Sequence, residues 1–250
     1  MADTIITNPA VIANEFNNFF VNIGPSLADK IPNTPLSTSG FNCPSHPFVF
    51  DPITEKELTD TIIKLKSCAS GHDELKSDIL KKCLPYIIKP LLHILNSSLM
   101  TGIFPEQFKL AKVIPLYKAD DSAIFSNYRP ISILPCLSKV LERLVYNRLI
   151  KFFNDNNLLY THQYGFREKH STSMALTQLI NNISLARDNK EVTLGVFVDL
   201  SKAFDTVNHN ILLQKLSFYG LNGMPLSWFH SYLSARNQLS WSCGITSPLI

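Results

Sequence analysis

The feature that most constrains this chain is a compact apolar run that leads directly into an acidic residue. Residues 193–198 are mostly β-branched or aromatic, and Asp199 follows them. A short run of this kind predicts a buried strand. A buried carboxylate is costly unless it is paired, hydrogen-bonded or bound to a cation, and Mg²⁺ prefers hard oxygen ligands. Two interpretations of Asp199 follow from the pattern: it caps the turn after the strand, or it binds a metal ion.

Helical and strand patterns alternate irregularly along the rest of the chain. A first helix starts at Pro9, and Gly24-Pro25 predicts its end. Thr54 and Glu57 form a capping-box pattern, which predicts a helix ending near residue 70. Further helices are expected over residues 77–99 (with possible breaks at Pro85 and Pro90), 138–153, 172–187, 208–219 and 225–235, and further strands over residues 113–117 and 237–243. Helices with a few scattered strands indicate an α+β fold.

Composition and charge narrow the class of protein. The 45% of hydrophobic and 17% of charged residues argue against disorder. Residues 1–105 hold 8 Lys or Arg and 10 Asp or Glu, whereas residues 106–250 hold 15 and 10. The basic second part suits a polyanionic partner, although an ordinary solvated surface explains the charge as well. Five widely spaced cysteines, with no leader-like N-terminus and no long apolar stretch, predict an intracellular protein without a membrane span.

The sequence around Asp199 closely resembles the first palm motif of non-LTR (LINE-type) retrotransposon reverse transcriptases. The motif runs from Val198 through Lys202, Phe204 and Asp205 to His209. The resemblance implies that Asp199 is a catalytic residue that binds the metal ions. It also implies that Phe204 packs under the sugar of the incoming nucleotide and excludes a ribose 2′-OH. The alternative for Phe204 is a core phenylalanine, and Asp205 is expected to stabilise the turn or the next helix start.

Two upstream segments resemble the fingers hairpin of the same family. They are residues 113–118, which end at Lys118, and residues 127–132, which contain Arg129. The resemblance implies that Lys118 and Arg129 contact the nucleotide triphosphate. Lysine supplies a compact charge and arginine binds phosphate oxygens bidentately. The alternatives are a surface lysine and an arginine tied to nearby carbonyl groups.

Two more segments follow in the family's order. Residues 138–148 resemble the helix after the hairpin, and Lys139, Arg143 and Arg148 are the expected contacts to the template backbone, with a solvated helix face as the alternative. Residues 163–172 resemble the segment that contacts the templating base and the incoming nucleotide. Its expected nucleotide-binding residues are Gln163, Gly165 and Arg167. A loop packed against the palm is the alternative there.

The resemblance covers nearly the whole chain and predicts its organisation. Residues 1–52 would form an N-terminal helix and a linker rich in Pro, Ser and Thr. Residues 53–190 would form the fingers of a right-hand polymerase, and residues 191–250 part of the palm. The expected fold is helix-rich with a few antiparallel strands. Residues 65–73 resemble the family's LKxxKSPGxDGI segment but carry Ala69 and Ser70 where Lys and Pro are usual, so a phosphate-contacting lysine is in doubt.

The implied activity is that of an RNA-directed DNA polymerase, with an RNA template, a DNA primer, dNTP substrates and Mg²⁺. The family's PQG segment and its aspartate pair do not occur in these 250 residues. Because two-metal catalysis needs several oxygen ligands, we expect the 250-residue chain to have no polymerase activity by itself. One alternative is an RNA-binding remnant without catalysis, and another is a relic that folds poorly.

Overall fold

The structure is a computed structural model, and it describes residues 6–28, 44–67, 69–200, 202–242 and 245–246. Its helices and strands, in chain order, are α1 (Pro9–Ala28), α2 (Glu55–Ile63), α3 (Ser77–Thr101), β1 (Ala111–Tyr117), β2 (Tyr128–Ile133), α4 (Cys136–Asp155), α5 (Thr172–Asp188), α6 (His209–Phe218), α7 (Met224–Leu233), β3 (Gln238–Ser242) and β4 (Ile245–Thr246). Short 3-10 helices cover Glu106–Phe108 and Phe125–Asn127. The first part of the expected linker, up to residue 43, lies outside the described residues. Within the described residues, no helix has the length and apolar character needed to cross a membrane.

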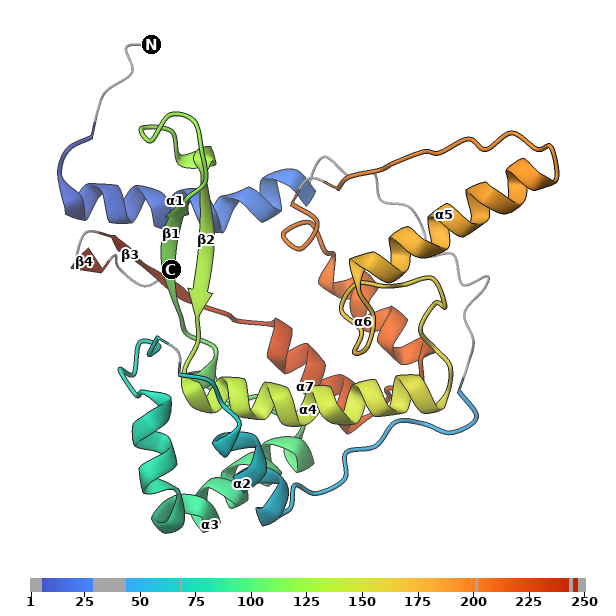
Figure 1. Ribbon diagram of the computed structural model, residues 1–250. Helices are drawn as coiled ribbons and strands as arrows, with labels where there is room; N and C mark the ends of the chain where they lie inside the picture. The colour runs from blue at the N-terminus through green and yellow to red at the C-terminus, as the bar shows by residue number, and fades with distance from the viewer. Residues whose placement is uncertain (1–5, 29–43, 68, 201, 243–244, 247–250) are drawn as a thin grey trace.

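The fold is α+β, as expected, with a sheet in the order β2-β1-β3-β4 (Figure 1). β1 and β2 form an antiparallel hairpin that pairs Lys112 with Ile133 at one end and Tyr117 with Tyr128 at the other. β3 pairs with β4 in the antiparallel sense but with β1 in the parallel sense. The expectation of antiparallel strands is therefore wrong for β1 and β3. The chain reaches β3 only after α4 to α7, and such a long connection permits a parallel partner.

The main core is an aromatic and aliphatic cluster shared by α2, α3, α4 and α7. Trp228 on α7 is 1% exposed, and its indole N–H donates to the Ser98 hydroxyl over 3.0 Å. Its ring centroid lies 5.2–5.8 Å from four other aromatic rings, those of Phe50, Phe104, Phe229 and Tyr232. This core holds α4 against α7 and thereby fixes one wall of the cleft described below.

Prolines end fewer helices than the sequence suggests. α1 continues through Pro25 to Ala28, so the predicted end at residue 24 is wrong. α3 runs unbroken through Pro85 and Pro90. Both of these prolines lie on the exposed side of α3, where water can hydrate the carbonyl group that each ring leaves without a donor.

α2 is shorter than the sequence predicts. Its start is confirmed, because the Thr54 hydroxyl accepts from the Glu57 amide over 3.2 Å. The helix ends at Ile63, several residues before the predicted end near residue 70.

The predicted buried strand over residues 193–198 is wrong. None of these residues belongs to a strand of the described chain, and their large side chains are exposed: Phe197 by 87% and Val198 by 79%. Apolar β-branched residues become a buried strand only when neighbouring strands supply a hydrogen-bonding ladder and a covered face. No described strand pairs with this segment, so the local propensity is not realised.

Candidate functional site

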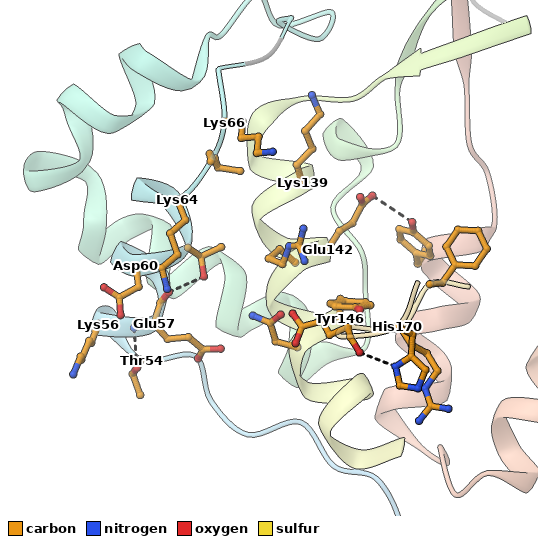
Figure 2. A pocket seen from close by; sticks show the side chains of 18 of the residues that line it. Thr54, Lys56, Glu57, Asp60, Lys64, Lys66, Lys139, Glu142, Tyr146 and His170 are labelled. Carbon is orange, nitrogen blue, oxygen red and sulfur yellow. Dashed lines mark hydrogen bonds between the residues drawn. The ribbon is translucent and has the colours of Figure 1, made fainter. Parts of the chain in front are cut away.

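A cleft of the described chain is lined by α2 and α4 and by residues of the loop 160–171 (Figure 2). We call it the α2–α4 cleft, and its volume is about 1480 Å³. Its described lining residues are Thr54, Lys56, Glu57, Asp60, Thr61, Lys64, Leu65, Lys66, Lys139, Glu142, Arg143, Tyr146, Asn147, Tyr164, Phe166, Arg167, Glu168, His170 and Tyr232. The cleft therefore brings together three of the predicted site residues, Lys139, Arg143 and Arg167.

The charge in the cleft favours an anionic ligand. Six Lys or Arg side chains and four Asp or Glu side chains are among the described lining residues. Two of the four carboxylates are engaged inside the chain: Arg148 of α4 binds Glu57, and Arg236 lies 3.7 Å from Glu142. The positive charges that face the open volume thus outnumber the carboxylates that remain to balance them.

Aromatic side chains alternate with these charges. Tyr146, Tyr164 and Phe166 line the cleft, and the Phe166 ring is 84% exposed. The guanidinium group of Arg143 lies 5.4 Å from the centroid of the Tyr146 ring. Basic groups with exposed rings are the combination that binds single-stranded nucleic acid, because phosphates need cations and unpaired bases stack on rings.

The loop that lines the cleft is held by its own polar groups. The Arg167 side chain donates to the Tyr160 carbonyl oxygen over 3.0 Å, and the Gln163 side chain donates to the Gly165 carbonyl oxygen over 3.1 Å. The space beside Gly165 is open, since an added Cβ there would meet no atom within 4 Å. Gln163 and Gly165 thus shape the loop, whereas Arg167 reaches the cleft.

Glu142 is the most perturbed acid of the cleft. Its carboxylate accepts from the Ser138 hydroxyl and from the Tyr232 hydroxyl, each over 3.3 Å. Burial raises the pKa of Glu142 above its ordinary value of 4.5, and the nearby positive charges of Arg236 and Lys139 offset part of that rise. Burial beside Glu142 also raises the pKa of Tyr232 to about 12.

This raised pKa predicts a stability that depends on pH. The folded chain binds the Glu142 proton more tightly than the unfolded chain does, so the contribution of Glu142 is fully present below pH 4.5 and declines as pH rises through the raised pKa. In urea unfolding at several pH values between 4 and 7, the free energy of unfolding of the wild type minus that of Glu142→Gln should fall with rising pH. A difference that is constant or that rises would contradict this role for Glu142.

The Arg148 side chain is held by hydrogen bonds within the chain and does not line the cleft. Its guanidinium group donates to both Glu57 carboxylate oxygens, at 2.5 and 2.8 Å, and to the carbonyl oxygens of Asp51, Pro52 and Leu144. These five bonds use every donor of the group. The Arg148 side chain thus ties α4 to the start of α2, and its expected contact with the template stays a prediction.

The hairpin residues lie elsewhere in the fold. Arg129 pairs with Leu116 in the β1–β2 ladder, and the Lys118 amide donates to the Asn127 carbonyl oxygen where the loop between the two strands begins. Both residues are exposed, and neither lines the α2–α4 cleft. Of the residues expected around a triphosphate, only Arg167 is in the cleft.

Asp199 and Phe204 lie in the exposed segment between α5 and α6. Asp199 is exposed in an extended stretch and does not line the cleft. Phe204 is 77% exposed, and its ring meets that of Phe166 edge to face with 5.9 Å between centroids. The segment between α5 and α6 and the loop of residues 160–171 are thus in contact through two exposed rings.

A metal centre is not complete among the described residues. No three His, Cys, Asp or Glu side chains of the described part of the chain are grouped as metal ligands. Asp199 supplies one carboxylate, whereas two-metal sites hold both ions with several oxygens. The described residues by themselves therefore do not fit a bound pair of Mg²⁺ ions, and we derive no chemical step through a metal.

Several cleft residues were not predicted from the sequence, among them Lys56, Lys64, Tyr146 and Phe166. Lys56, Asp60 and Lys64 recur every four residues, which signals one polar face of α2. Nothing in that spacing indicates that this face lies opposite α4. The packing of Leu58 and Ile62 in the core they share with α4 decides it.

Comparison with known proteins agrees with the motif order. Residues 117–247 match the family "Reverse transcriptase (RNA-dependent DNA polymerase)". The chain is 37% identical over 199 residues to a probable RNA-directed DNA polymerase from transposon BS of Drosophila melanogaster, covering 76% of this chain and 22% of that protein. It is 35% identical over 165 residues to the RNA-directed DNA polymerase from mobile element jockey of Drosophila melanogaster, covering 65% and 18%.

A third relative is a probable RNA-directed DNA polymerase from transposon X-element of Drosophila melanogaster. The identity there is 31% over 190 residues, covering 74% of this chain and 20% of that protein. The chain thus spans about a fifth of the length of these relatives. The matched family covers more than half of the chain, and these relatives are polymerases of mobile elements. The chain therefore belongs to the reverse transcriptase family, in its non-LTR retrotransposon branch.

Proposed function

We propose that this chain is the part of an RNA-directed DNA polymerase that holds the template strand in the α2–α4 cleft. The observation that carries the proposal is the convergence of Lys139, Arg143 and Arg167 with the exposed ring of Phe166 around one open volume. Cations bind the phosphates of a single strand, and an exposed ring stacks with an unpaired base. A solvated helix face would not explain why basic groups from two separate segments, α4 and the loop of residues 160–171, meet around one cleft.

The remaining predicted residues are assigned to the nucleotide side of the same enzyme. Lys118 and Arg129 on the hairpin would contact the dNTP triphosphate, and Phe204 would pack under its sugar. Asp199 would bind Mg²⁺ together with ligands beyond the described residues. In this proposal residues 53–190 are fingers, residues 191–250 are part of the palm, residues 1–52 precede the polymerase, and the enzyme acts inside the cell on an RNA template and a DNA primer.

The test is RNA binding by the 250-residue chain. Fluorescence anisotropy with a labelled 12-nucleotide single-stranded RNA would compare the wild type with Lys139→Gln/Arg143→Gln/Arg167→Gln at 50 to 200 mM KCl. Loss of three phosphate contacts should lower the slope of log Kobs against log salt by about 2 and weaken binding at low salt by at least roughly tenfold.

The matched control removes the same charge away from the cleft. Lys82, Lys89 and Lys151 are exposed and do not line it, so Lys82→Gln/Lys89→Gln/Lys151→Gln should bind RNA nearly as the wild type does. Equal losses in the two triple variants would mean that general charge, and not this cleft, binds RNA. No salt dependence in the wild type would reject the proposal altogether.

A second function uses the same cleft without catalysis. The absence of a grouped set of metal ligands among the described residues favours an RNA-binding role that needs no chemistry in this chain. Primer extension separates the two functions. Extension above an Asp199→Ala control would show catalysis by this chain, whereas RNA binding without extension would favour the purely binding role.

A further inference from the structure

α1 connects two regions that the proposed function uses, although it lies outside the residues that match the family. It crosses the sheet next to the β1–β2 hairpin (Figure 1). Phe16 is 5% exposed, and its ring meets those of Phe125 and Tyr128 edge to face, each with 4.8 Å between centroids. One face of α1 is thus packed against the loop end of the hairpin that carries Lys118 and Arg129.

A polar contact fixes α1 on the sheet as well. Asn17 is 0% exposed, and its side-chain oxygen accepts from the Gln238 side chain over 2.9 Å. Gln238 is the first residue of β3, which pairs with β1. A hydrogen bond from a buried amide helps to set the position of a helix along its axis, because sliding by one residue would break it.

The C-terminal half of α1 meets the turn that carries Phe204. The Lys202 ammonium lies 5.6 Å from the centroid of the Phe19 ring. At Gly24 the approach is closer still, because a Cβ added there would lie 2.9 Å from the Asp205 carbonyl oxygen. Only glycine lets the helix backbone come this near to the turn.

The turn itself has few other supports in the described chain. The Asp205 and Thr206 amides donate to the Lys202 carbonyl oxygen, at 2.9 and 3.3 Å, and Lys202 has a φ of 50°. The segment before the turn pairs with no described strand, and Phe204 is exposed apart from its contact with Phe166. The position of the Phe204 ring therefore depends on what holds the backbone of this turn.

We infer that α1 positions the turn of residues 202–206 through Gly24 and Phe19, and that it thereby sets the Phe204 ring against Phe166 at the edge of the α2–α4 cleft. Gly24 and Phe19 are positioning residues, since neither lines the cleft. The functional part of this inference rests on the proposed function. The structural part, the contact between α1 and the turn, is independent of it.

Gly24→Ala is the informative variant. Alanine favours a helix over glycine, so α1 itself should form at least as well as in the wild type. The new methyl group must displace the Asp205 carbonyl, because the conflict is with backbone and not with a flexible side chain. Hydrogen exchange followed by NMR on the 250-residue chain should show the Asp205 and Thr206 amides exchanging faster by at least roughly tenfold, while amides in α4 keep wild-type rates.

Asn22→Ala is the matched control, since Asn22 lies on the exposed side of the same helix. It should leave the amides of the turn unchanged. Unchanged exchange at residues 205 and 206 in Gly24→Ala would overturn the inference. If Gly24→Ala fails to fold, Phe19→Leu replaces it, because leucine keeps the apolar contact but removes the ring beside Lys202.

The functional arm is a double-mutant cycle on RNA affinity. Phe166→Ala should weaken single-stranded RNA binding by roughly five-fold or more, as expected for one stacked base. In the Gly24→Ala background, the factor by which Phe166→Ala weakens RNA binding should be about three times smaller. The Phe204 ring that packs against Phe166 is already displaced in that background. If the effects of Gly24→Ala and Phe166→Ala on RNA affinity were additive, the positioning role would be overturned. If the wild-type chain bound no RNA, the proposed function would be overturned, but the hydrogen-exchange test of the contact between α1 and the turn would still hold.

Discussion

Replacing Arg148 by methionine should lower the free energy of unfolding by about 3 kcal/mol and leave RNA affinity unchanged. The change removes five hydrogen bonds at once and leaves the Glu57 carboxylate without its partner. The Arg148 side chain is 12% exposed and that of Glu57 is 31% exposed, so solvent screens the pair only in part. Urea unfolding followed by circular dichroism measures the stability, and anisotropy with single-stranded RNA measures the affinity.

Arg143→Met is the matched control, because it changes the same residue type on the same helix. Arg143 is exposed, lines the cleft and contacts Tyr146, and it makes no ion pair recorded among the described residues. This variant should lose RNA affinity and keep nearly all of its stability. If Arg148→Met instead weakened RNA binding at unchanged stability, the structural role assigned to Arg148 would be wrong.

Replacing Trp228 by alanine should cost about 3–5 kcal/mol of stability, the largest effect expected of any single change here. The indole is almost fully buried among four aromatic rings and donates to Ser98. Its stacked neighbour Tyr232 lies 5.5 Å away and donates to Glu142, so the damage should reach the wall of the cleft. Thermal and urea unfolding measure the loss.

Trp228→Phe separates the two contributions of the indole. Phenylalanine keeps a ring in the core but removes the N–H that donates to the Ser98 hydroxyl, which keeps its own bond to the Ile103 carbonyl oxygen. Its cost should therefore be smaller, on the order of 1–2 kcal/mol plus a modest cavity term. Equal losses in the alanine and phenylalanine variants would assign the stability to the hydrogen bond and not to ring packing. A loss below about 1 kcal/mol in Trp228→Ala would contradict a core centred on α7.

Local patterns in the sequence predicted most of the helices, although not the ends of α1 and α2, and the first strand of the hairpin. The Thr54 and Glu57 pair marks the start of α2 because a capping bond joins residues three apart. The apolar spacing along residues 138–153 predicts α4, whose buried residues include Val140, Leu141 and Leu144. The order of motifs predicts the family, since each motif is a short run of residues that can be read without knowing its neighbours in space.

Residues 193–198 show what a local sequence pattern cannot predict. Their composition is that of a buried strand, yet strand formation needs hydrogen-bonding partners from elsewhere in the chain, and the described residues supply none to this segment. The same limit applies to Arg148 and Arg143, which lie five residues apart on one helix and have the same chemistry in the sequence. Only the packing of α2 against α4 directs one guanidinium into an internal carboxylate and leaves the other facing the cleft.

The sequence by itself therefore determined the family, the α+β class and most of the helices, because these depend on residues that are neighbours in the chain. The tertiary structure alone decided which basic residues share a cleft, that Glu142 is buried beside Tyr232, and that α1 reaches the turn of residues 202–206. The contacts of α2 with α4, of Glu142 with Tyr232 and of Gly24 with Asp205 join residues about 90 to 180 positions apart. Such contacts are set by how whole helices pack and not by the periodicity within any one of them.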